Sequence, residues 1–274
     1  MQTLTTQGVT MPKLGLGTFR LTGENCRRAV ESALALGYRH IDTAEMYANE
    51  DAVGAALASS GVPRGEVFVT TKAWHDHLEP QTIRAALAAS LDKLRLDHAD
   101  LYLVHWPVPG MKLGPALDTL MQLRDEGRIR ALGVANFTVP LLRQAVEEIG
   151  APIACNQIEY HVLLDQSPVR RYLAANSIPL VAYAPLAQGR LADHAELAAI
   201  ARKHGATPAQ VALKWALDQD GVAAIPKAGR RESQKANLDA FAIALDEADR
   251  RVIAGLPKDQ RFVNPAFAPR WDIA

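Results

Sequence analysis

The sequence predicts a (β/α)8 TIM barrel, an α/β fold. Short apolar segments rich in β-branched residues recur along its 274 residues, each bounded by glycine, proline or charged residues, as buried parallel strands are. Helical patterns separate them, and the expected strands begin roughly 20 to 40 residues apart, about the length of a β–α unit. Eight such strands alternating with helices in a chain of this length indicate a closed barrel.

The expected strands cover residues 15–19, 40–44, 67–72, 101–106, 131–137, 153–160, 179–186 and 222–228. A hairpin with a turn at Gln7-Gly8 precedes them, and we expect it to close the bottom of the barrel. An open doubly wound sheet is the alternative, and it usually carries a G-x-G-x-x-G turn after its first strand. Gly15 and Gly17 match only the start of that pattern, and no helix opens after them, which favours the barrel.

Helix signals stand between the strands. The segment TIRAALAASLDKL repeats an apolar residue every four positions from Ile83, which predicts an amphipathic helix. NEDAVGAAL opens with Asn49 and two acids, a typical helix N-terminus. In ATPAQVALKWAL, Thr207 is the expected N-cap and Pro208 the first helical residue.

No linker or low-complexity segment divides the chain, so we expect one domain over residues 1–274. The tail RFVNPAFAPRWDIA has no periodicity. Its proline-flanked aromatics, Phe262, Phe267 and Trp271, indicate an ordered loop over the barrel mouth.

The overall composition points to no macromolecular partner. Lys plus Arg is 30 and Asp plus Glu is 30, so the net charge is zero and nothing indicates nucleic acid or an anionic membrane surface. The only cysteines, Cys26 and Cys155, suit a reducing compartment better than a disulfide framework. The N-terminus lacks a basic, apolar leader and no apolar run has transmembrane length, so we expect a cytoplasmic protein.

A polar or ionisable side chain stands at the end of nearly every expected strand after the first. In such barrels the C-terminal ends of the strands form the functional face. Because burying several charges in one mouth is costly unless they pair, the set is a site hypothesis, although each member alone has a structural explanation. The residues are Asp42, Lys72, His105, Asn136, Gln157, Glu159, Tyr183 and Lys227, with Tyr47 in the loop after the second strand.

These residue types suit the protonation of a carbonyl oxygen. Asp42 can pair with Lys72, and a cation beside a phenol lowers the phenol's pKa from about 10 toward neutrality. Tyr47 could then donate a proton as a general acid, and neutral His105 could orient the same oxygen. Since no nucleophilic Cys or Ser stands out, a hydride from a cofactor is the expected attacker.

The motifs DTAEMYANE, TKAWHDH, LYLVHWP, GVANF, NQIEYH and AYAPLAQGRL resemble those of the aldo-keto reductases in order and spacing, over nearly the whole chain. The resemblance implies NADPH-dependent, metal-free reduction of aldehydes and ketones by a tetrad of Asp42, Tyr47, Lys72 and His105, with Tyr47 as the proton donor. The compact loops and the ending AFAPRWD resemble a bacterial branch of the family, which suggests 2,5-diketo-D-gluconate, methylglyoxal or related small carbonyls as substrates.

The resemblance also assigns the NADP(H) site. The matched positions are Asn136 and Gln157 for the nicotinamide carboxamide, Tyr183 for the nicotinamide ring, Pro185, Leu186, Gln188 and Gly189 for the pyrophosphate, Lys227, Arg230 and Arg231 for the 2′-phosphate, and Asn237 for the adenine. Two positions depart from the family pattern. Ala135 replaces a serine that would contact the carboxamide, and Ser233 replaces an arginine of the phosphate clamp, so NADH use stays open.

Phe19, Trp74, His105 and Trp106 flank the tetrad motifs and are expected to line the substrate pocket. The expected partner is a small carbonyl compound, with no nucleic acid, no membrane and a monomeric enzyme.

Other functions remain open from the residues alone. Lys72 at a strand end could form a Schiff base in an aldolase. His40 and Asp42 could begin a metal site of a hydrolase. The barrel could also bind NADP without turnover, as a redox-sensing subunit.

Overall fold

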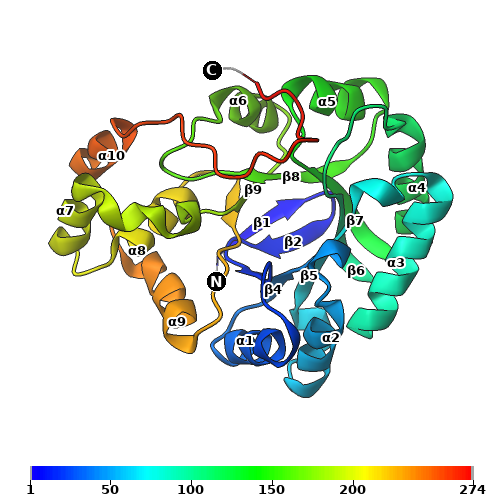
Figure 1. Cartoon of the computed structure of the whole chain (residues 1–274), viewed down its shortest axis with the longest axis horizontal. Helices are drawn as coiled ribbons and strands as arrows, with labels where there is room; N and C mark the ends of the chain where they lie inside the picture. Colours follow the sequence, from blue (N-terminus) through cyan, green and yellow to red (C-terminus); the bar gives the residue numbers. More distant parts are fainter. Residues whose placement is uncertain (1, 273–274) are drawn as a thin grey trace.

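Eight parallel strands follow one another around a barrel in the computed structural model, which describes residues 2–272 without the side chain of Asp193 (Figure 1). The strands are β3 (Leu16–Gly17), β4 (His40–Asp42), β5 (Phe68–Ala73), β6 (Ala99–Val104), β7 (Ile129–Ala135), β8 (Ile153–Glu159), β9 (Leu180–Tyr183) and β10 (Val222–Ala224). They pair in sequence order, and parallel bridges from Leu14 to Ala224 and from Gly17 to Lys227 join the first strand to the last. The predicted TIM barrel is confirmed.

Barrel closure depends on Gly17. A Cβ atom at this position would lie 2.6 Å from the carbonyl oxygen of Ile225, closer than side chains approach a backbone. Glycine therefore allows β3 to meet the segment after β10, and it brings the loop after β3 next to Lys227 at the barrel mouth.

Helices cover the outside of the barrel between successive strands (Figure 1). They are α1 (Gly23–Ala35), α2 (Glu50–Ser59), α3 (Pro80–Leu94), α4 (Leu113–Asp125), α5 (Val139–Arg143), α6 (Ser167–Ala175), α7 (Ala195–Lys203), α8 (Pro208–Leu217), α9 (Arg231–Asp239) and α10 (Glu247–Ala254). A π-turn, η4 (Gln144–Glu148), continues α5, and short 3-10 turns η1 (Glu45–Tyr47), η2 (Arg64–Glu66), η3 (His75–His77), η5 (Ala187–Asp193) and η6 (Ala240–Ala242) lie in the connections.

The core has two apolar layers, one inside the barrel and one between the strands and the helices. Inside, residues such as Leu101, Leu103 and Val181 fill the barrel below the mouth. Outside, Val69 and Tyr102 point to the helices, whose apolar faces they meet. This alternation along each strand follows from the two-residue period of β-structure, and it leaves the last inward positions of the strands for polar groups.

One of the two expected N-caps behaves as predicted. The Thr207 hydroxyl accepts a hydrogen bond from the Gln210 N–H, and Pro208 opens α8. Asn49 stands at the N-cap position of α2, but its side chain makes no capping bond. Its amide instead donates to the carbonyls of Thr18 and Leu21 and accepts from the Thr43 hydroxyl. Asn49 therefore ties the loop after β3 to the loop after β4.

The N-terminal hairpin closes the bottom of the barrel, as expected. It comprises β1 (Thr3–Thr6) and β2 (Val9–Pro12), and its turn residues Gln7 and Gly8 both have positive φ. The Thr6 hydroxyl donates to the carbonyl of Ala154 inside the barrel. Ligands therefore reach the barrel from the opposite end.

No helix between residues 2 and 272 is long and apolar enough to cross a membrane. Both cysteines are buried as free thiols. Because the first and last strands close one barrel, we propose that the chain forms a single domain.

Candidate active site

A buried lysine lies at the centre of the site. Lys72, near the end of β5, is fully buried and donates three hydrogen bonds, to Asp42 Oδ1 at 2.6 Å, to the Thr43 carbonyl at 2.7 Å and to the Tyr47 hydroxyl at 3.3 Å. Burial alone would lower the pKa of Lys72, but the charge of Asp42, aided by these hydrogen bonds, raises it above the ordinary value. The lysine is therefore a fixed ammonium whose three protons are all engaged.

Tyr47 reaches the site because the chain leaves β4 in the one-turn helix η1. Its hydroxyl oxygen accepts a hydrogen bond from Lys72 Nζ, so its own O–H is directed away from the lysine. The expectation that Lys72 lowers the pKa of Tyr47 toward neutrality is wrong for the free site. Burial raises the pKa of Tyr47 above its usual value, and the attraction of Lys72 offsets this only in part. Tyr47 is thus a phenol that keeps its proton.

His105 follows β6 and faces Tyr47, with 5.7 Å between the ring centroids. Its Nδ1 atom is buried without a partner among the described residues, so Nε2 is the nitrogen that can reach the cavity. Burial, together with the charge of Lys72, holds the pKa of His105 well below its usual range. The imidazole is therefore neutral at physiological pH and can donate a hydrogen bond from Nε2, as expected from the sequence.

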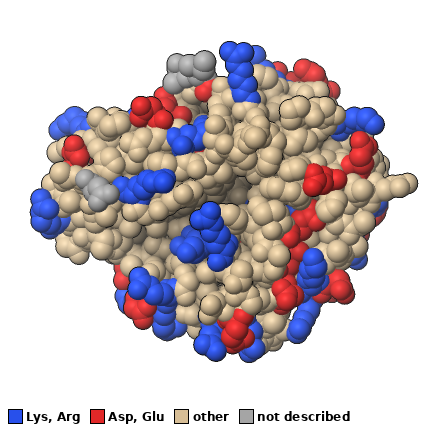
Figure 2. Space-filling model, viewed as in Figure 1, with Lys and Arg blue, Asp and Glu red and all other residues tan. Residues whose placement is uncertain are grey.

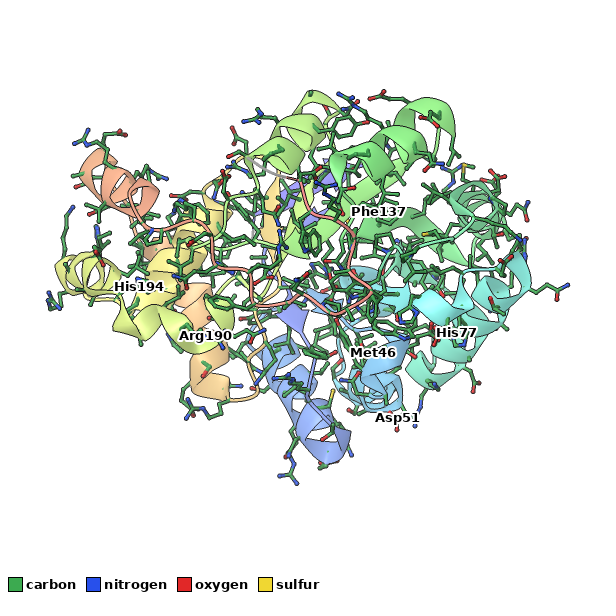
Figure 3. The ribbon with its side chains drawn as sticks, turned by 45° about the horizontal axis from the view of Figure 1, so that its top comes forward. Met46, Asp51, His77, Phe137, Arg190 and His194 are labelled. Atoms are coloured by element: carbon green, nitrogen blue, oxygen red, sulfur yellow. The ribbon has the colours of Figure 1, made fainter. Side chains whose placement is uncertain are left out.

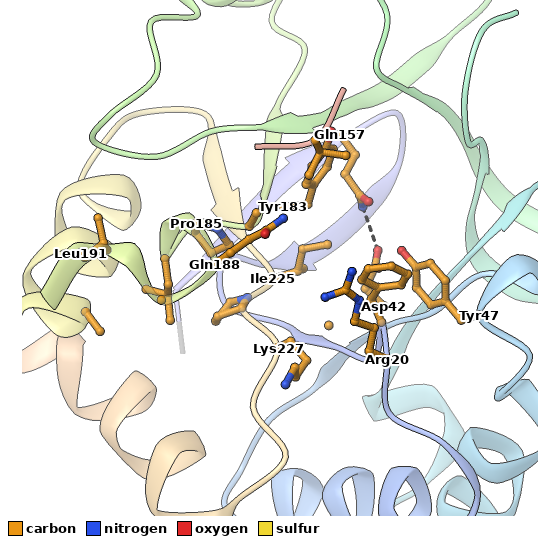
Figure 4. A pocket seen from close by; sticks show the side chains of 18 of the residues that line it. Arg20, Asp42, Tyr47, Gln157, Tyr183, Pro185, Gln188, Leu191, Ile225 and Lys227 are labelled. Atoms are coloured by element: carbon orange, nitrogen blue, oxygen red, sulfur yellow. Dashed lines mark hydrogen bonds between the residues drawn. The ribbon is translucent and has the colours of Figure 1, made fainter. Parts of the chain in front are cut away.

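Two amide side chains and a tyrosine form the inner wall next to Asp42. Gln157, on β8, donates to Asp42 Oδ2 at 2.8 Å (Figure 4). Asn136, after β7, donates to the carbonyl of His105 at 3.0 Å and accepts from the Tyr183 hydroxyl at 2.8 Å. Each amide can form further hydrogen bonds, because a side-chain amide has two N–H donors and an oxygen that accepts two hydrogen bonds. The wall can therefore bind a planar amide ligand.

A cavity of about 730 Å³ opens above these groups. Asp42 and Tyr47 lie on one side of it, and Pro185, Gln188 and Leu191 lie on the other (Figure 4). Of the residues matched to the family, the lining includes Phe19, Asp42, Tyr47, His105, Trp106, Asn136, Gln157, Tyr183, Pro185, Leu186, Gln188, Gly189 and Lys227.

The segment after β9 has an unusual backbone at the cavity edge. Ala187, Gln188 and Gly189 have φ values of 47°, 54° and 88°, all in the left-handed region. Such residues form concave turns whose N–H groups can cradle an anion. Because this segment lines the cavity, it is suited to a pyrophosphate.

Cations lie beside the same opening, where Lys and Arg side chains border the central hollow (Figure 2). Lys227 lines the cavity, whereas Arg230 and Arg231 lie further along the same segment, at the start of α9, and do not. None of the three forms an ion pair with a carboxylate of the described chain. Asn237 is buried on α9 and does not line the cavity either.

The side of the cavity that is expected to hold the substrate is aromatic, but it differs from the expectation at Trp74. Phe19 and Trp106 line the cavity, whereas Trp74 does not. In the tail, Phe267 packs edge-on against Trp74 at 5.8 Å and against Trp106 at 5.6 Å. Trp271 also packs on Trp106, at 6.1 Å. Phe267 and Trp271 therefore lie beside the mouth, as expected, whereas Phe262 stacks on His161.

Glu159 has a different position from the other strand-end residues. It is fully buried, and its two oxygens accept hydrogen bonds from the N–H groups of Phe262 and Val263 at 2.8 and 3.0 Å. His161 lies 3.1 Å from the same carboxylate. Glu159 therefore anchors the base of the tail and does not line the cavity.

Sequence reasoning missed several residues of the cavity wall. Arg20 brings a further cation to the cavity wall, to which Lys227 also belongs (Figure 4), and has a φ of 64°. Met46, Leu191 and Ile225 supply apolar wall. The arginine directly after the first strand end was a usable signal for Arg20, whereas nothing in the local pattern distinguishes the apolar residues.

His40 and Asp42 do not share a metal site. The ring nitrogens of His40 lie 3.3 Å from the Pro12 carbonyl and 3.2 Å from the Thr70 hydroxyl, inside the barrel. Within residues 2–272 no group of three or more His, Cys, Asp or Glu side chains is placed to hold a metal ion.

Comparisons with known proteins agree with this fold. The profile of the Aldo/keto reductase family matches residues 13–256. The chain is 42% identical over 268 residues to methylglyoxal reductase DkgB of Salmonella typhimurium, covering 96% of this chain and 100% of that protein. It is 41% identical over 255 residues to a glyoxal reductase of Bacillus subtilis, covering 93% and 92%. A crystal structure of a candidate 2,5-diketo-D-gluconic acid reductase B superposes with a TM-score of 0.97 at 38% identity, covering 100% of this chain and 98% of that one.

Proposed function

This chain belongs to the aldo/keto reductase family, and we propose that it reduces small aldehydes and ketones with NADPH, using Tyr47 as the proton donor. The observation that carries the proposal is the set of bonds around Lys72. The ammonium donates to Asp42, Thr43 and Tyr47, so the hydroxyl of Tyr47 can only donate away from the lysine.

The chain's own residues account for the proton side of the reaction. A carbonyl oxygen placed between Tyr47 and His105 would receive two hydrogen bonds, one from the phenol and one from Nε2 of the neutral imidazole. As negative charge develops on that oxygen, Tyr47 transfers its proton to it. Lys72 then stabilises the phenolate that remains, and Asp42 keeps the lysine charged.

The cavity fits a nicotinamide dinucleotide. Asn136 and Gln157 offer amide groups to a carboxamide beside the Tyr183 ring, and the left-handed segment at Gln188 and Gly189 suits a pyrophosphate. When bound, the reduced cofactor would supply a hydride to the carbonyl carbon. We propose NADPH over NADH because a 2′-phosphate requires cations. Lys227 lines the cavity, Arg230 and Arg231 lie further along the same segment, and none of the three has a carboxylate partner in the described chain.

The Schiff-base alternative is weaker. An aldolase lysine must lose a proton to attack a carbonyl, which requires a lowered pKa. The pKa of Lys72 is raised instead, with Asp42 at 2.6 Å, and its side chain has no exposed surface.

The substrate class rests on the names of relatives and on the shape of the pocket. Methylglyoxal, glyoxal and 2,5-diketo-D-gluconate are small and polar, and we propose compounds of this size. The tail aromatic Phe267 packs against Trp74 and Trp106, and we propose that it limits the space above the tetrad. We propose that the monomer is active, because one chain supplies all of these groups.

The test follows the absorbance of the reduced nicotinamide in the presence of purified protein and a carbonyl panel, with NADPH and NADH compared at equal concentration. The panel holds methylglyoxal, glyoxal, a diketo sugar acid and an aromatic aldehyde. We expect turnover with at least one of them and a higher kcat/KM with NADPH. No consumption with any substrate would leave a non-catalytic cofactor-binding protein, and borohydride trapping of substrate on Lys72 would support the aldolase.

A further inference from the structure

Glu45 connects the turn that carries Tyr47 to the loop that carries Trp74. One oxygen of its carboxylate accepts a hydrogen bond from the backbone N–H of Trp74. Both oxygens lie near Nδ1 of His77, at 3.1 and 3.0 Å. Met46, the neighbour of Glu45, and His77 lie on the same side of the barrel in Figure 3. The Glu45 side chain is only 14% exposed, and it does not line the cavity.

The residue that Glu45 holds is a neighbour of the catalytic imidazole. The Trp74 ring packs edge-on against His105, with 5.1 Å between centroids and 73° between planes. His105 in turn packs edge-on against Tyr47. Three rings thus contact one another in series, and the two ends of the series, Tyr47 and Trp74, are joined through Glu45.

We propose that Glu45 is a positioning residue for carbonyl reduction, since it fixes the Trp74 ring, and through it His105, relative to the turn that supplies Tyr47. This inference rests on the proposed function, in which Tyr47 and His105 act on one oxygen. Tyr47 and His105 must keep their relative orientation to act on one oxygen. The imidazole has no hydrogen bond at Nδ1 that would hold it in this orientation. Packing against Trp74 supplies that restraint, and the backbone bond to Glu45 fixes where Trp74 stands.

The inference requires the length and the acceptor oxygen of the side chain, and it does not require the charge. Glu45→Gln retains both, so we expect kcat within about twofold of the wild type. Glu45→Asp keeps the charge but is one methylene shorter. Because displacements near 1 Å can cost up to about 100-fold in rate, we expect its kcat to fall about tenfold, with the Kd for NADPH unchanged. Glu45→Met, which keeps the length without an acceptor, should behave like Glu45→Asp and replaces it if that variant does not fold.

His77→Gln is the matched control, because it removes only the outer partner of Glu45 and leaves the bond to the Trp74 N–H. We expect wild-type kcat. A loss of kcat in Glu45→Gln together with wild-type kcat in Glu45→Asp would overturn the inference, because the charge and not the reach would then matter.

A double-mutant cycle tests whether Glu45 acts through the Trp74 ring. Trp74→Ala removes the ring and keeps the backbone N–H. In that background Glu45→Asp should change kcat by less than about twofold, since the restraint on His105 is already lost. An equal fold-loss in both backgrounds would show that Glu45 acts by another route.

The near-ultraviolet circular dichroism of Trp74 provides a readout that does not depend on turnover. The Trp74 band is obtained by subtracting the spectrum of Trp74→Phe. We expect Glu45→Asp to weaken this band and Glu45→Gln to retain it. An unchanged band in Glu45→Asp contradicts the positioning role, whereas wild-type protein without any reductase activity contradicts the proposed function alone.

Discussion

Lys72 Nζ lies 2.6 Å from Asp42 Oδ1, and both side chains are almost completely removed from solvent, with exposed fractions of 0% and 1%. Taking two charges out of water is costly, and their attraction repays the cost only while both are present. The pair is therefore a requirement of the site and a weak point of the fold. Gln157 also stabilises the buried carboxylate, because it donates a hydrogen bond to the other oxygen of Asp42.

Asp42→Asn should destabilise the protein by about 3–5 kcal/mol, because it leaves the Lys72 ammonium buried without its counter-charge. Urea unfolding followed by circular dichroism measures this. The double change Asp42→Asn with Lys72→Met should recover part of the loss, since no charge then remains buried. As a control, Asp239→Asn breaks the exposed pair with Lys235 and should cost less than about 1 kcal/mol. Equal losses at Asp42 and Asp239 would contradict the argument.

Tyr47→Phe should lower kcat by at least about 100-fold, the usual contribution of general acid catalysis, while the Kd for NADPH stays within error. The phenyl ring preserves the contact with Phe19 at 5.1 Å, so the change removes only the hydroxyl. Steady-state kinetics and quenching of cofactor fluorescence measure the two quantities. Tyr172→Phe removes a hydroxyl bound to Glu147 on the outside of the barrel and serves as the control. Near-normal turnover in Tyr47→Phe would assign the acid to another group.

The pH profile of kcat/KM should be flat across the neutral range. Tyr47 must carry a proton to act, and burial raises its pKa above the ordinary value of 10. Activity is therefore present below the raised pKa and is lost as the pH rises through that raised pKa. His105 must be neutral, and burial with the charge of Lys72 holds its pKa well below 6.5, so it gains a proton only in acid. Initial rates between about pH 5 and 10, in a buffer of constant ionic strength, test this, because the range includes the ordinary pKa values of both histidine and tyrosine. A fall centred between pH 7 and 9 would show a lowered tyrosine pKa in the working enzyme.

The cations after β10 should set the choice of cofactor. Lys227→Ala, Arg230→Ala and Arg231→Ala each remove one positive charge from the segment next to the cavity. If each makes a charge-assisted bond to a 2′-phosphate, the Kd for NADPH rises about 10- to 100-fold and the Kd for NADH hardly changes. Lys235→Ala, on the same helix but paired with Asp239, is the matched control. Equal effects on both cofactors would remove the basis for an NADPH preference.

The sequence was sufficient for the barrel and for grouping the residues of the proposed tetrad, for physical reasons. Parallel strands buried on both faces appear as short apolar runs, and the ends of parallel strands meet at one edge, so Lys72 and His105 could be placed together before their distances were known. The side-chain bonds of Asn49 could not be predicted, because the same amide can cap a helix or bind two carbonyls of a distant loop, and only the closed barrel brings Thr18 and Leu21 to it.

Properties that depend on how deeply a side chain is buried, or on the direction in which it points, could not be predicted either. The pKa of Tyr47 is decided by burial competing with the charge of Lys72, and the sequence indicated only the charge. Glu159 has the same strand-end position as the tetrad residues. Its direction, toward the tail rather than the cavity, follows from where Phe262 and Val263 cross the barrel.

Phe267 should limit the size of the substrate. Its ring contacts Trp74, Trp106 and His75, at centroid distances of 5.8, 5.6 and 4.5 Å, and so covers the wall behind the tetrad. Phe267→Ala uncovers Trp74 and enlarges the space next to His105. We expect kcat/KM for a bulky aromatic aldehyde to rise relative to that for methylglyoxal, because only the larger compound fills the new space.

Phe262→Ala is the matched control for this change. Phe262 also belongs to the tail, but it stacks on His161 at 5.3 Å and lies against Arg190 at 4.3 Å, and none of the three lines the cavity. Its removal should lower stability without changing the ratio of the two substrates. Kinetics with both aldehydes at saturating NADPH decide between the outcomes. If Phe267→Ala and Phe262→Ala change the ratio equally, the tail acts through its general order, and Phe267 has no specific role in excluding large substrates.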